Sequence, residues 1–412
     1  MNILHINTFD NKGGAARAAY RIHTSLKDIG LSSEMLVAKK KSIYDESVKE
    51  FNIPFLRKKK WLTNKILSLH KTPSNSYRSC NLFYSGIYKV INQSKADIVH
   101  LHWIGNEMLS ISEIRKIRKK IVWTLHDMWV FSGTEHVDFH GRYRSSYRRE
   151  NKLDGKKGII NIDDWIWKKK RKYWSDICFN FVTPSKWLAN CLSESSLFFE
   201  KEAVVIPNCL DVDLFKPKKK YTHEKGDYAS RKKLILFGAV RGRDDALKGF
   251  SFLKKALGNI SSDSLSGNVE CIVFGGDTRD HLEMINGVNI RDVGRISDDN
   301  KLAALYSSVD VFVAPSLIEA FGQTASEAHA CGTPVVAFNN SGLADIIEHK
   351  KTGYLAEPFS PEDLAAGIIW VLADEKRLVE LGREARKKAE KEYNYKIVAQ
   401  QYKKLYEKIL SL

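Results

Sequence analysis

Short runs of β-branched and apolar residues alternate along this chain with longer stretches in which apolar residues recur at helical spacing. A short apolar run bounded by turn residues is typical of a buried strand, and apolar positions three and four apart are typical of a helix packed on one face. The runs predict strands at 2–9, 33–38, 96–103, 120–129, 179–183, 203–207, 233–240, 270–275, 309–315 and 335–338. Because helical spacing follows most of these runs, the pattern predicts an α/β fold built on parallel sheets.

A polar segment divides this alternation into two parts. Residues 216–231, KPKKKYTHEKGDYASR, hold few apolar side chains, and we interpret them as the linker between two domains. The first domain is therefore expected at 1–215 and the second at 216–392, with a last amphipathic helix at 393–412. A chain of 412 residues is long enough for two domains of ordinary size.

The stretch 315–336, PSLIEAFGQTASEAHACGTPVV, has the clearest chemical pattern. It lies between two predicted strands and predicts a turn followed by a short helix that ends at Cys331-Gly332-Thr333-Pro334. The start of such a helix places backbone N–H groups and a positive dipole end at the carboxyl edge of a sheet, where a phosphate can bind. Glu319 in the turn and Glu327 in the helix could accept hydrogen bonds from sugar or ribose hydroxyls at the same ligand.

The pattern E-x-F-G-x-x-x-x-E followed by A-x-x-C-G-T-P-V-V resembles the donor site of the retaining GT-B glycosyltransferases of family four, glycosyl transferases group 1. The segments D-x-V-H-x-H, T-L-H-D, V-x-x-S-x-W-L and I-P-N-x-x-D-x-x-x-F of the first part resemble the same family. The resemblance is strongest over 294–357 and weakest over 40–95 and 135–175. It implies two Rossmann-like domains facing across a cleft, with the C-terminal helix crossing back to the first domain.

The resemblance also implies roles for residues of the second part. Glu319 would meet hydroxyls of the transferred sugar, Glu327 would accept the ribose hydroxyls, and backbone near Arg295 and Ile296 would line the nucleobase pocket. Expected to bind the donor are Gly13, Gly14, Arg243, Lys248, Arg295, Ile296, Glu319, Ala320, Phe321, Gly322, Thr324 and Glu327. Expected to act in catalysis are His126, Glu319 and Lys248.

Two cations are expected at the diphosphate. Lys248 lies at the start of a predicted helix, where an ammonium can bind a diphosphate together with the helix dipole. In the family an arginine directly follows the glycine of the preceding strand, but here Ala239 follows Gly238. Arg241 and Arg243 are the substitutes that the sequence offers, and it does not distinguish between them.

The first part offers weaker signals. Gly13-Gly14 lies between a predicted strand and helix, which fits an ordinary turn or a phosphate-facing loop, and the resemblance favours the loop. By the same resemblance His126, at the end of a predicted strand, would touch the transferred sugar. The histidines at 100, 102, 126, 136 and 140 match no zinc-binding spacing, so no metal site is predicted. The resemblance likewise implies that no divalent metal is needed on the diphosphate.

Charge is concentrated in the first part. The chain has a net charge of +17; residues 1–215 hold 36 Lys and Arg against 22 Asp and Glu, whereas residues 216–412 hold 30 against 27. This excess requires an anionic partner: nucleic acid, anionic lipid or a phosphorylated substrate. Residues 56–78 mix cations with Trp61 and Leu62, as expected either of a helix on an anionic membrane or of a solvated helix with its apolar face on the core.

The basic segment 141–174 is predicted to be a long insertion that either holds an acceptor pyrophosphate or is a solvated excursion. No apolar run approaches 18 residues, and the N-terminus predicts a strand rather than a signal peptide. The six scattered cysteines fit free thiols in a reducing compartment. We therefore expect a cytoplasmic protein that is peripheral on the inner face of the cytoplasmic membrane.

Together these features predict a retaining, metal-independent transfer of a sugar from a nucleotide diphosphate sugar to a hydroxyl of a saccharide acceptor. The branch of the family that the chain best resembles implies a lipid-linked acceptor and bacterial surface-polysaccharide synthesis, with no cofactor besides the substrates. Two alternatives are a GT-B nucleotide-sugar epimerase and a basic nucleic-acid-binding protein. The glutamate spacing disfavours the first, and the lack of any helix-turn-helix, zinc or RNP-like pattern disfavours nucleic acid as a partner.

Overall fold

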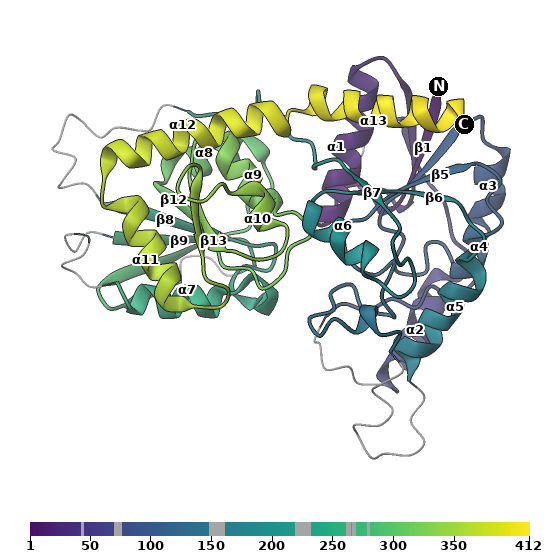
Figure 1. Cartoon of the computed structure of the whole chain (residues 1–412), viewed down its shortest axis with the longest axis horizontal. Helices are drawn as coiled ribbons and strands as arrows, with labels where there is room; N and C mark the ends of the chain where they lie inside the picture. Colours follow the sequence, from purple (N-terminus) through teal and green to yellow (C-terminus); the bar gives the residue numbers. More distant parts are fainter. Residues whose placement is uncertain are drawn as a thin grey trace. The chain divides into compact units, whose positions relative to one another are not determined.

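The structure is a computed structural model that describes the chain except for residues 43–44, 70–75, 148–160, 219–231, 261–264, 266–268 and 278–280 (Figure 1). It divides into two compact units. The first unit comprises Met1–Cys209 and Val398–Leu412, and the second unit comprises Leu210–Ile397. Each unit has its own twisted sheet with helices on both faces, which confirms the expected α/β fold class.

The first unit is built on seven strands in the order β3-β2-β1-β4-β5-β6-β7, with every neighbouring pair parallel. The strands are β1 (Asn2–Phe9), β2 (Ser32–Lys39), β3 (Val48–Glu50), β4 (Ile98–Leu101), β5 (Lys120–Thr124), β6 (Phe179–Thr183) and β7 (Ala203–Val205). The α-helices are α1 (Gly14–Asp28), α2 (Leu56–Ser68), α3 (Ile87–Gln93), α4 (Ile111–Ile114), α5 (Ile162–Trp174) and α6 (Lys186–Ser193). The chain leaves β1 toward β2 on one side and β4 toward β5 on the other, so the ligand-binding edge is expected where β1 and β4 end.

The last helix, α13 (Tyr395–Ser411), packs on this first sheet from Val398 onward. The Tyr402 hydroxyl lies 3.1 Å from Thr124 Oγ1, and the Tyr406 hydroxyl lies 2.7 Å from His100 Nδ1. Lys120 Nζ donates to the Ile409 carbonyl at 2.6 Å. These contacts join the C-terminal helix to β4 and β5, as the expectation of a helix crossing back to the first domain requires.

The second unit has seven strands in the order β10-β11-β9-β8-β12-β13-β14, parallel except for the β10–β11 pair. They are β8 (Lys233–Gly238), β9 (Val269–Phe274), β10 (Leu282–Ile285), β11 (Val288–Gly294), β12 (Val311–Ala314), β13 (Val335–Phe338) and β14 (Gly353–Ala356). The α-helices are α7 (Phe250–Gly258), α8 (Asp299–Ser308), α9 (Gln323–Ala330), α10 (Leu343–Ile346), α11 (Pro361–Leu372) and α12 (Glu375–Glu392).

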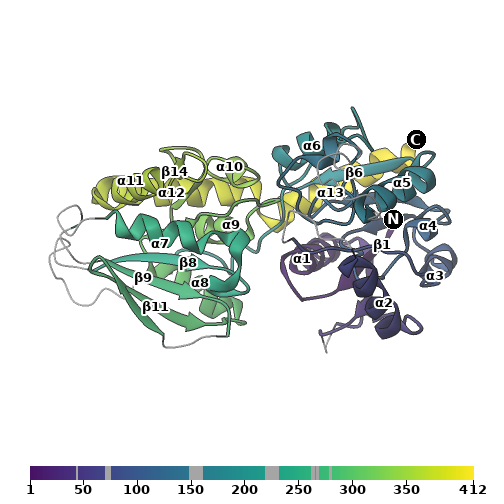
Figure 2. The ribbon, with the colours of Figure 1, turned by 90° about the horizontal axis from the view of Figure 1, so that it is seen from below.

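Alternation along the strands of the second unit produces two cores. Ile235 and Phe237 of β8 point to the face covered by α7 and α11, whereas Leu236 points to the face covered by α8, α9 and α10. Since both faces are buried, the strands appear in the sequence as continuous apolar runs, which is why they could be predicted. Figure 2 shows α7 lying over β8 and β9.

The borders between the units differ from those expected at residues 215 and 392. Leu210 already belongs to the second unit, because its N–H donates to the Tyr393 carbonyl at 2.7 Å and its carbonyl accepts from the Tyr395 N–H at 3.0 Å. Arg386 donates to the carbonyls of Val212 and Phe215 at 3.0 and 2.7 Å. Most of the predicted linker 216–231 lies outside the described residues.

Several elements were not predicted, among them the strands β3 and β14. The hairpin of β10 and β11 turns at Asn286-Gly287, where both residues have positive φ, of 46° and 80°. That dipeptide between alternating residues is a recognised hairpin signal. The end of the predicted insertion 141–174 is instead the helix α5, capped by Asn161 and anchored by the buried Trp167 and Trp174. The insertion's residues 148–160 lie outside the described part of the chain.

Candidate functional site

The strands β8 and β12 are neighbours from which the chain moves outward in opposite directions, toward β9 and toward β13. In such sheets ligands bind beyond the carboxyl ends of the two strands at this reversal. The segment after β8 forms two short 3₁₀ turns, Gly242–Asp244 and Ala246–Lys248, before α7. The segment after β12 is the turn that contains Glu319 and leads into α9. The predicted site therefore lies where the fold favours a ligand.

The two segments are packed closely against each other. The Leu317 N–H donates to the Leu247 carbonyl at 2.8 Å. Gly249 has a φ of 73°, and a Cβ at this position would lie 1.8 Å from the Pro315 carbonyl oxygen. Only glycine permits this close approach, and the approach brings Lys248 to the Glu319 turn.

Lys248 and Glu319 form an ion pair between Nζ and Oε1, although they are 71 residues apart in sequence. Ser316 Oγ donates to the same carboxylate oxygen at 3.3 Å, and the Glu319 N–H donates to Ser341 Oγ at 3.1 Å. Their side chains remain 28% and 17% exposed. A ligand can therefore reach an ammonium and a carboxylate that are held in place beside each other.

The α9 helix supplies the dipole that the sequence predicted. It begins after Gly322, which has a φ of 109° and has no side chain with which to cap this end. Thr324 lies partly exposed in the first turn, and Ala320 lies partly exposed before it. The Phe321 ring is 4% exposed and packs edge-on against Tyr393. Phe321 thus anchors the turn in the core, so that any contact of residue 321 with a ligand would come from its backbone.

Glu327 lies deeper than Glu319. It is 2% exposed, and the Tyr306 hydroxyl donates to its Oε2 at 3.2 Å. Tyr306 was not among the predicted site residues, because a tyrosine in the helix 21 residues earlier gives no sequence signal for this contact. The role of Glu327 toward a ribose remains a prediction.

Arg243 is bound to other residues of the second unit. Its Nε donates to Asp292 Oδ1 at 3.0 Å, and its Nη1 donates to Glu283 Oε2 at 2.6 Å. The guanidinium also lies 4.8 Å above the centre of the Phe250 ring. Arg243 thus ties the β10–β11 hairpin to the loop after β8. Of the two candidate arginines, Arg241 is exposed and takes no part in these pairs.

Arg295 and Ile296 follow β11, at the same sheet edge but two strands from β8. The Arg295 side chain is 57% exposed and lies 3.9 Å from the exposed Asp277. Ile296 is partly buried against the core between α8 and α9. Both residues therefore lie at the sheet edge that holds the predicted site, and their use by a nucleobase remains a prediction.

The remaining predicted residues lie in the first unit. Gly13, with a φ of 87°, precedes α1, and Gly14 is the first residue of that helix. His126 follows β5, with its Nε2 3.0 Å from His102 Nδ1. Burial lowers the pKa of His126 to about 4, more than the neighbouring Asp127 raises it, so this imidazole is neutral at pH 7.

Asp127 anchors the loop beside His126. Its Oδ2 accepts from Trp103 Nε1 at 2.8 Å and lies 2.6 Å from His136 Nδ1. Burial alone would raise the pKa of Asp127, but His136 and a hydrogen bond from the Trp129 N–H hold that pKa below its usual value. Neither Asp127 nor Trp103 was predicted to be functional, although Asp127 ends the T-L-H-D pattern and Trp103 directly follows D-x-V-H-x-H.

Two family models match consecutive parts of the chain. The model of Glycosyltransferase Family 4 matches residues 12–214, and the model of Glycosyl transferases group 1 matches residues 220–388. The chain belongs to the GT-B glycosyltransferases of family four.

Known relatives of this family-four chain agree with that assignment. An uncharacterised glycosyltransferase of Methanocaldococcus jannaschii is 39% identical over 34% of this chain and 36% of its own length. The phosphatidyl-myo-inositol mannosyltransferase of Mycobacterium leprae is 27% identical over 76% of this chain and 74% of its own length. The matches span 36% and 51% of the first two curated relatives. The crystal structure of Anabaena HepE with UDP and glucose superposes with a TM-score of 0.66 at 15% identity, covering 98% of this chain and 99% of that protein, which shows the shared fold.

Proposed function

We propose that this protein transfers a sugar from a nucleotide diphosphate sugar to a hydroxyl of a saccharide acceptor, with retention of the anomeric configuration and without a divalent metal. The observation that supports this most is the Lys248–Glu319 pair beside the start of α9, at the strand reversal of the second unit. A cation and a helix dipole, which can bind a diphosphate, lie there beside a carboxylate that can accept hydrogen bonds from sugar hydroxyls.

In this proposal the protein acts mainly by stabilising the leaving diphosphate. Lys248, Arg241 and the N-terminal turn of α9 offset the charge that develops as the bond from sugar to phosphate breaks. Glu319 accepts hydrogen bonds from the transferred sugar, and His126 orients that sugar. The leaving phosphate takes the proton of the acceptor hydroxyl, so no enzyme nucleophile is required.

Turnover is expected to survive EDTA. Lys248 and the helix dipole supply the positive charge that Mg²⁺ or Mn²⁺ supplies in metal-dependent transferases. The test is release of nucleoside diphosphate from UDP-, GDP- and ADP-sugars by the full chain, with and without excess EDTA. Equal rates support the proposal. Loss of turnover with EDTA that Mg²⁺ or Mn²⁺ restores would disprove metal independence without disproving the transfer.

We further propose a lipid-linked saccharide acceptor, in bacterial polysaccharide synthesis at the inner face of the cytoplasmic membrane. The M. leprae relative acts, by its name, on a phosphatidylinositol. The helix α2 buries only Thr63 and leaves Trp61 55% and Leu62 40% exposed, so these two apolar side chains do not lie on the core. Among the described helices, none combines the length and apolar character that crossing a bilayer requires. Peripheral binding through α2 is the mode that these features support.

Binding to anionic vesicles is expected to weaken when α2 loses charge. Arg57 and Lys58 are exposed, and each cation near an anionic surface contributes about 1 kcal/mol. The variant Arg57→Gln/Lys58→Gln should therefore bind phosphatidylserine vesicles about tenfold or more weakly in flotation at low salt. The control is Lys376→Gln/Lys391→Gln on α12, which removes the same charge from exposed positions of the second unit.

An equal loss in both variants would mean that only net charge matters. Equal binding of the unaltered protein to neutral and anionic vesicles, or binding to neither, would contradict membrane association through α2.

A further inference from the structure

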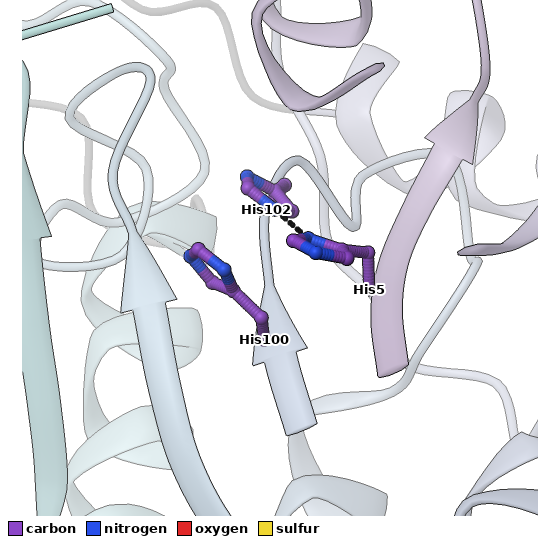
Figure 3. Close-up of side chains that lie close together, drawn as sticks. All are labelled: His5, His100 and His102. Carbon is purple, nitrogen blue, oxygen red and sulfur yellow. Dashed lines mark hydrogen bonds between the residues drawn. The ribbon is translucent and has the colours of Figure 1, made fainter. Parts of the chain in front are cut away.

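Three histidines of the first unit form a hydrogen-bonded chain that leads inward from His126. His126 Nε2 lies 3.0 Å from His102 Nδ1. His102 Nε2 lies 2.9 Å from His5 Nδ1, a contact drawn as a dashed line in Figure 3. In the register of β1 and β4, His5 lies opposite His100, and His102 is two residues further along the chain. The rings of His5, His100 and His102 therefore extend from one face of the sheet. His5 and His102 are 0% and 2% exposed. The chain thus joins the partly exposed His126 to two buried imidazoles.

Each link of this chain needs one N–H and one nitrogen lone pair. A neutral imidazole has a single N–H. Burial lowers the pKa of His5 and of His102 well below the ordinary value, and that of His126 to about 4, so all three are neutral at pH 7. Two proton arrangements remain. Either His5 donates to His102 and His102 donates to His126, or all donors point the opposite way.

The buried end of the chain distinguishes the two arrangements. His5 Nε2 is buried and finds no hydrogen-bond partner among the described residues. If the donors pointed toward His5, this nitrogen would carry a buried N–H without an acceptor, which is rare in folded proteins. If the donors point toward His126, His5 Nε2 carries only an unused lone pair, which costs less free energy than a buried N–H without an acceptor. The arrangement in which His5 donates to His102 and His102 donates to His126 leaves Nδ1 of His126 as its protonated nitrogen.

We propose that His5 and His102 are positioning residues that hold His126 in the Nδ1–H tautomer, so that His126 offers a ligand a hydrogen-bond donor. The inference rests on the proposed function insofar as it takes the ligand to be the transferred sugar. An N–H at Nδ1 can donate to a sugar hydroxyl oxygen, and a nitrogen that already holds a proton cannot take one from the acceptor. This agrees with a reaction in which the leaving phosphate accepts that proton.

A metal is the alternative use of this cluster. The nitrogen atoms of His5, His100 and His102 lie within 4.8 Å of one another, and neutral imidazoles are ligands for zinc and copper. However, both nitrogens of His100 lie 2.7 Å from hydroxyls, of Thr124 and of Tyr406. Both nitrogens of His102 already take part in the hydrogen bonds with His5 and His126. A metal would have to replace these bonds.

The direct test is the tautomer of each ring in the unaltered full chain. Long-range ¹H–¹⁵N correlation spectra of ¹⁵N-histidine protein at pH 7.5 should show His126, His102 and His5 as Nδ1–H tautomers. An Nε2–H signal for His126 would overturn the proposal, and so would one equivalent of tightly bound transition metal in the purified protein. This readout needs no activity, so it can fail while the proposed sugar transfer holds, and the reverse.

Variants of His102 test the positioning role. The amide nitrogen of His102→Asn can take the place of Nδ1 and still donate, whereas His102→Leu cannot. His102→Leu should give a mixture of His126 tautomers and lower kcat by about tenfold with an unchanged donor KM, on the scale of losing an orienting partner. His102→Asn should recover the single tautomer and most of kcat.

The control for these variants is His100→Asn, which removes an equally buried ring two residues earlier, in β4, but none that bonds to His126. It should leave the His126 tautomer unchanged. If the two His102 variants behave alike, or if His100→Asn has the effect of His102→Leu, the proposal is wrong. Should His102→Leu fail to fold, the tautomers of the unaltered protein still decide.

Discussion

Replacing Lys248 with alanine is expected to lower kcat by about 10²–10³-fold, the scale on which a site loses one charge-stabilising donor. The ammonium lies at the strand reversal of the second unit, paired with Glu319 and beside the start of α9. Its effect should be largest when the diphosphate carries most charge, because the attraction grows as the leaving bond breaks. The loss should therefore appear in kcat and in kcat/KM more than in donor KM.

The matched control is Lys254→Ala. Lys254 is on α7, is 51% exposed and pairs with Glu283 at 2.6 Å. The Lys254→Ala variant therefore loses a comparable ion pair away from the turn that contains Glu319. Its turnover should stay within about twofold of the unaltered enzyme, as expected for an exposed pair. Thermal unfolding of both variants separates a folding defect from a chemical one. Rates near those of the unaltered protein in Lys248→Ala would mean that the diphosphate binds elsewhere.

The parts of the fold that could be predicted are those buried on both faces of a sheet. β8, β9, β12 and β13 appear as continuous apolar runs because α-helices cover both sides of them. The hairpin of β10 and β11 is at the sheet edge, alternates in polarity and lacks such a run, so it was missed despite its Asn286-Gly287 turn. Missing that hairpin also hid the partners of Arg243, since Asp292 and Glu283 belong to it.

The site could be predicted as a set of residues but not as a geometry. The resemblance placed Lys248 and Glu319 at one ligand, yet only the fold shows that they pair, through the close approach that Gly249 allows. The depth of Glu327 under Tyr306 also had no sequence signal. Similarly, the spacing of His100 and His102 could have indicated a shared strand face, whereas the link to His5 depends on the register between β1 and β4.

Alanine substitutions of Glu327 and Glu319 are expected to change different kinetic constants. Glu327 is 2% exposed within α9, and in the proposed reaction it accepts hydrogen bonds from the ribose. The ribose is remote from the reacting carbon, so this contact is the same in the ground state and the transition state. Glu327→Ala should therefore raise donor KM with kcat largely kept. Affinity for the bare nucleoside diphosphate should weaken by roughly 1.5–3 kcal/mol, the contribution of a hydrogen bond to a charged group.

Glu319→Ala should act mainly on kcat. Its carboxylate is 17% exposed in the turn, where it would meet the sugar as positive charge develops. Removing it also frees Lys248, whose ammonium then binds a diphosphate without competition, so bare nucleotide should bind at least as tightly as before. Glu327→Gln is the control for burial, because it keeps the side-chain volume and an acceptor for the Tyr306 hydroxyl. Calorimetry with the nucleoside diphosphate, alongside steady-state kinetics, distinguishes the two roles. If Glu319→Ala weakens nucleotide binding as much as Glu327→Ala does, the two glutamates have been assigned wrongly.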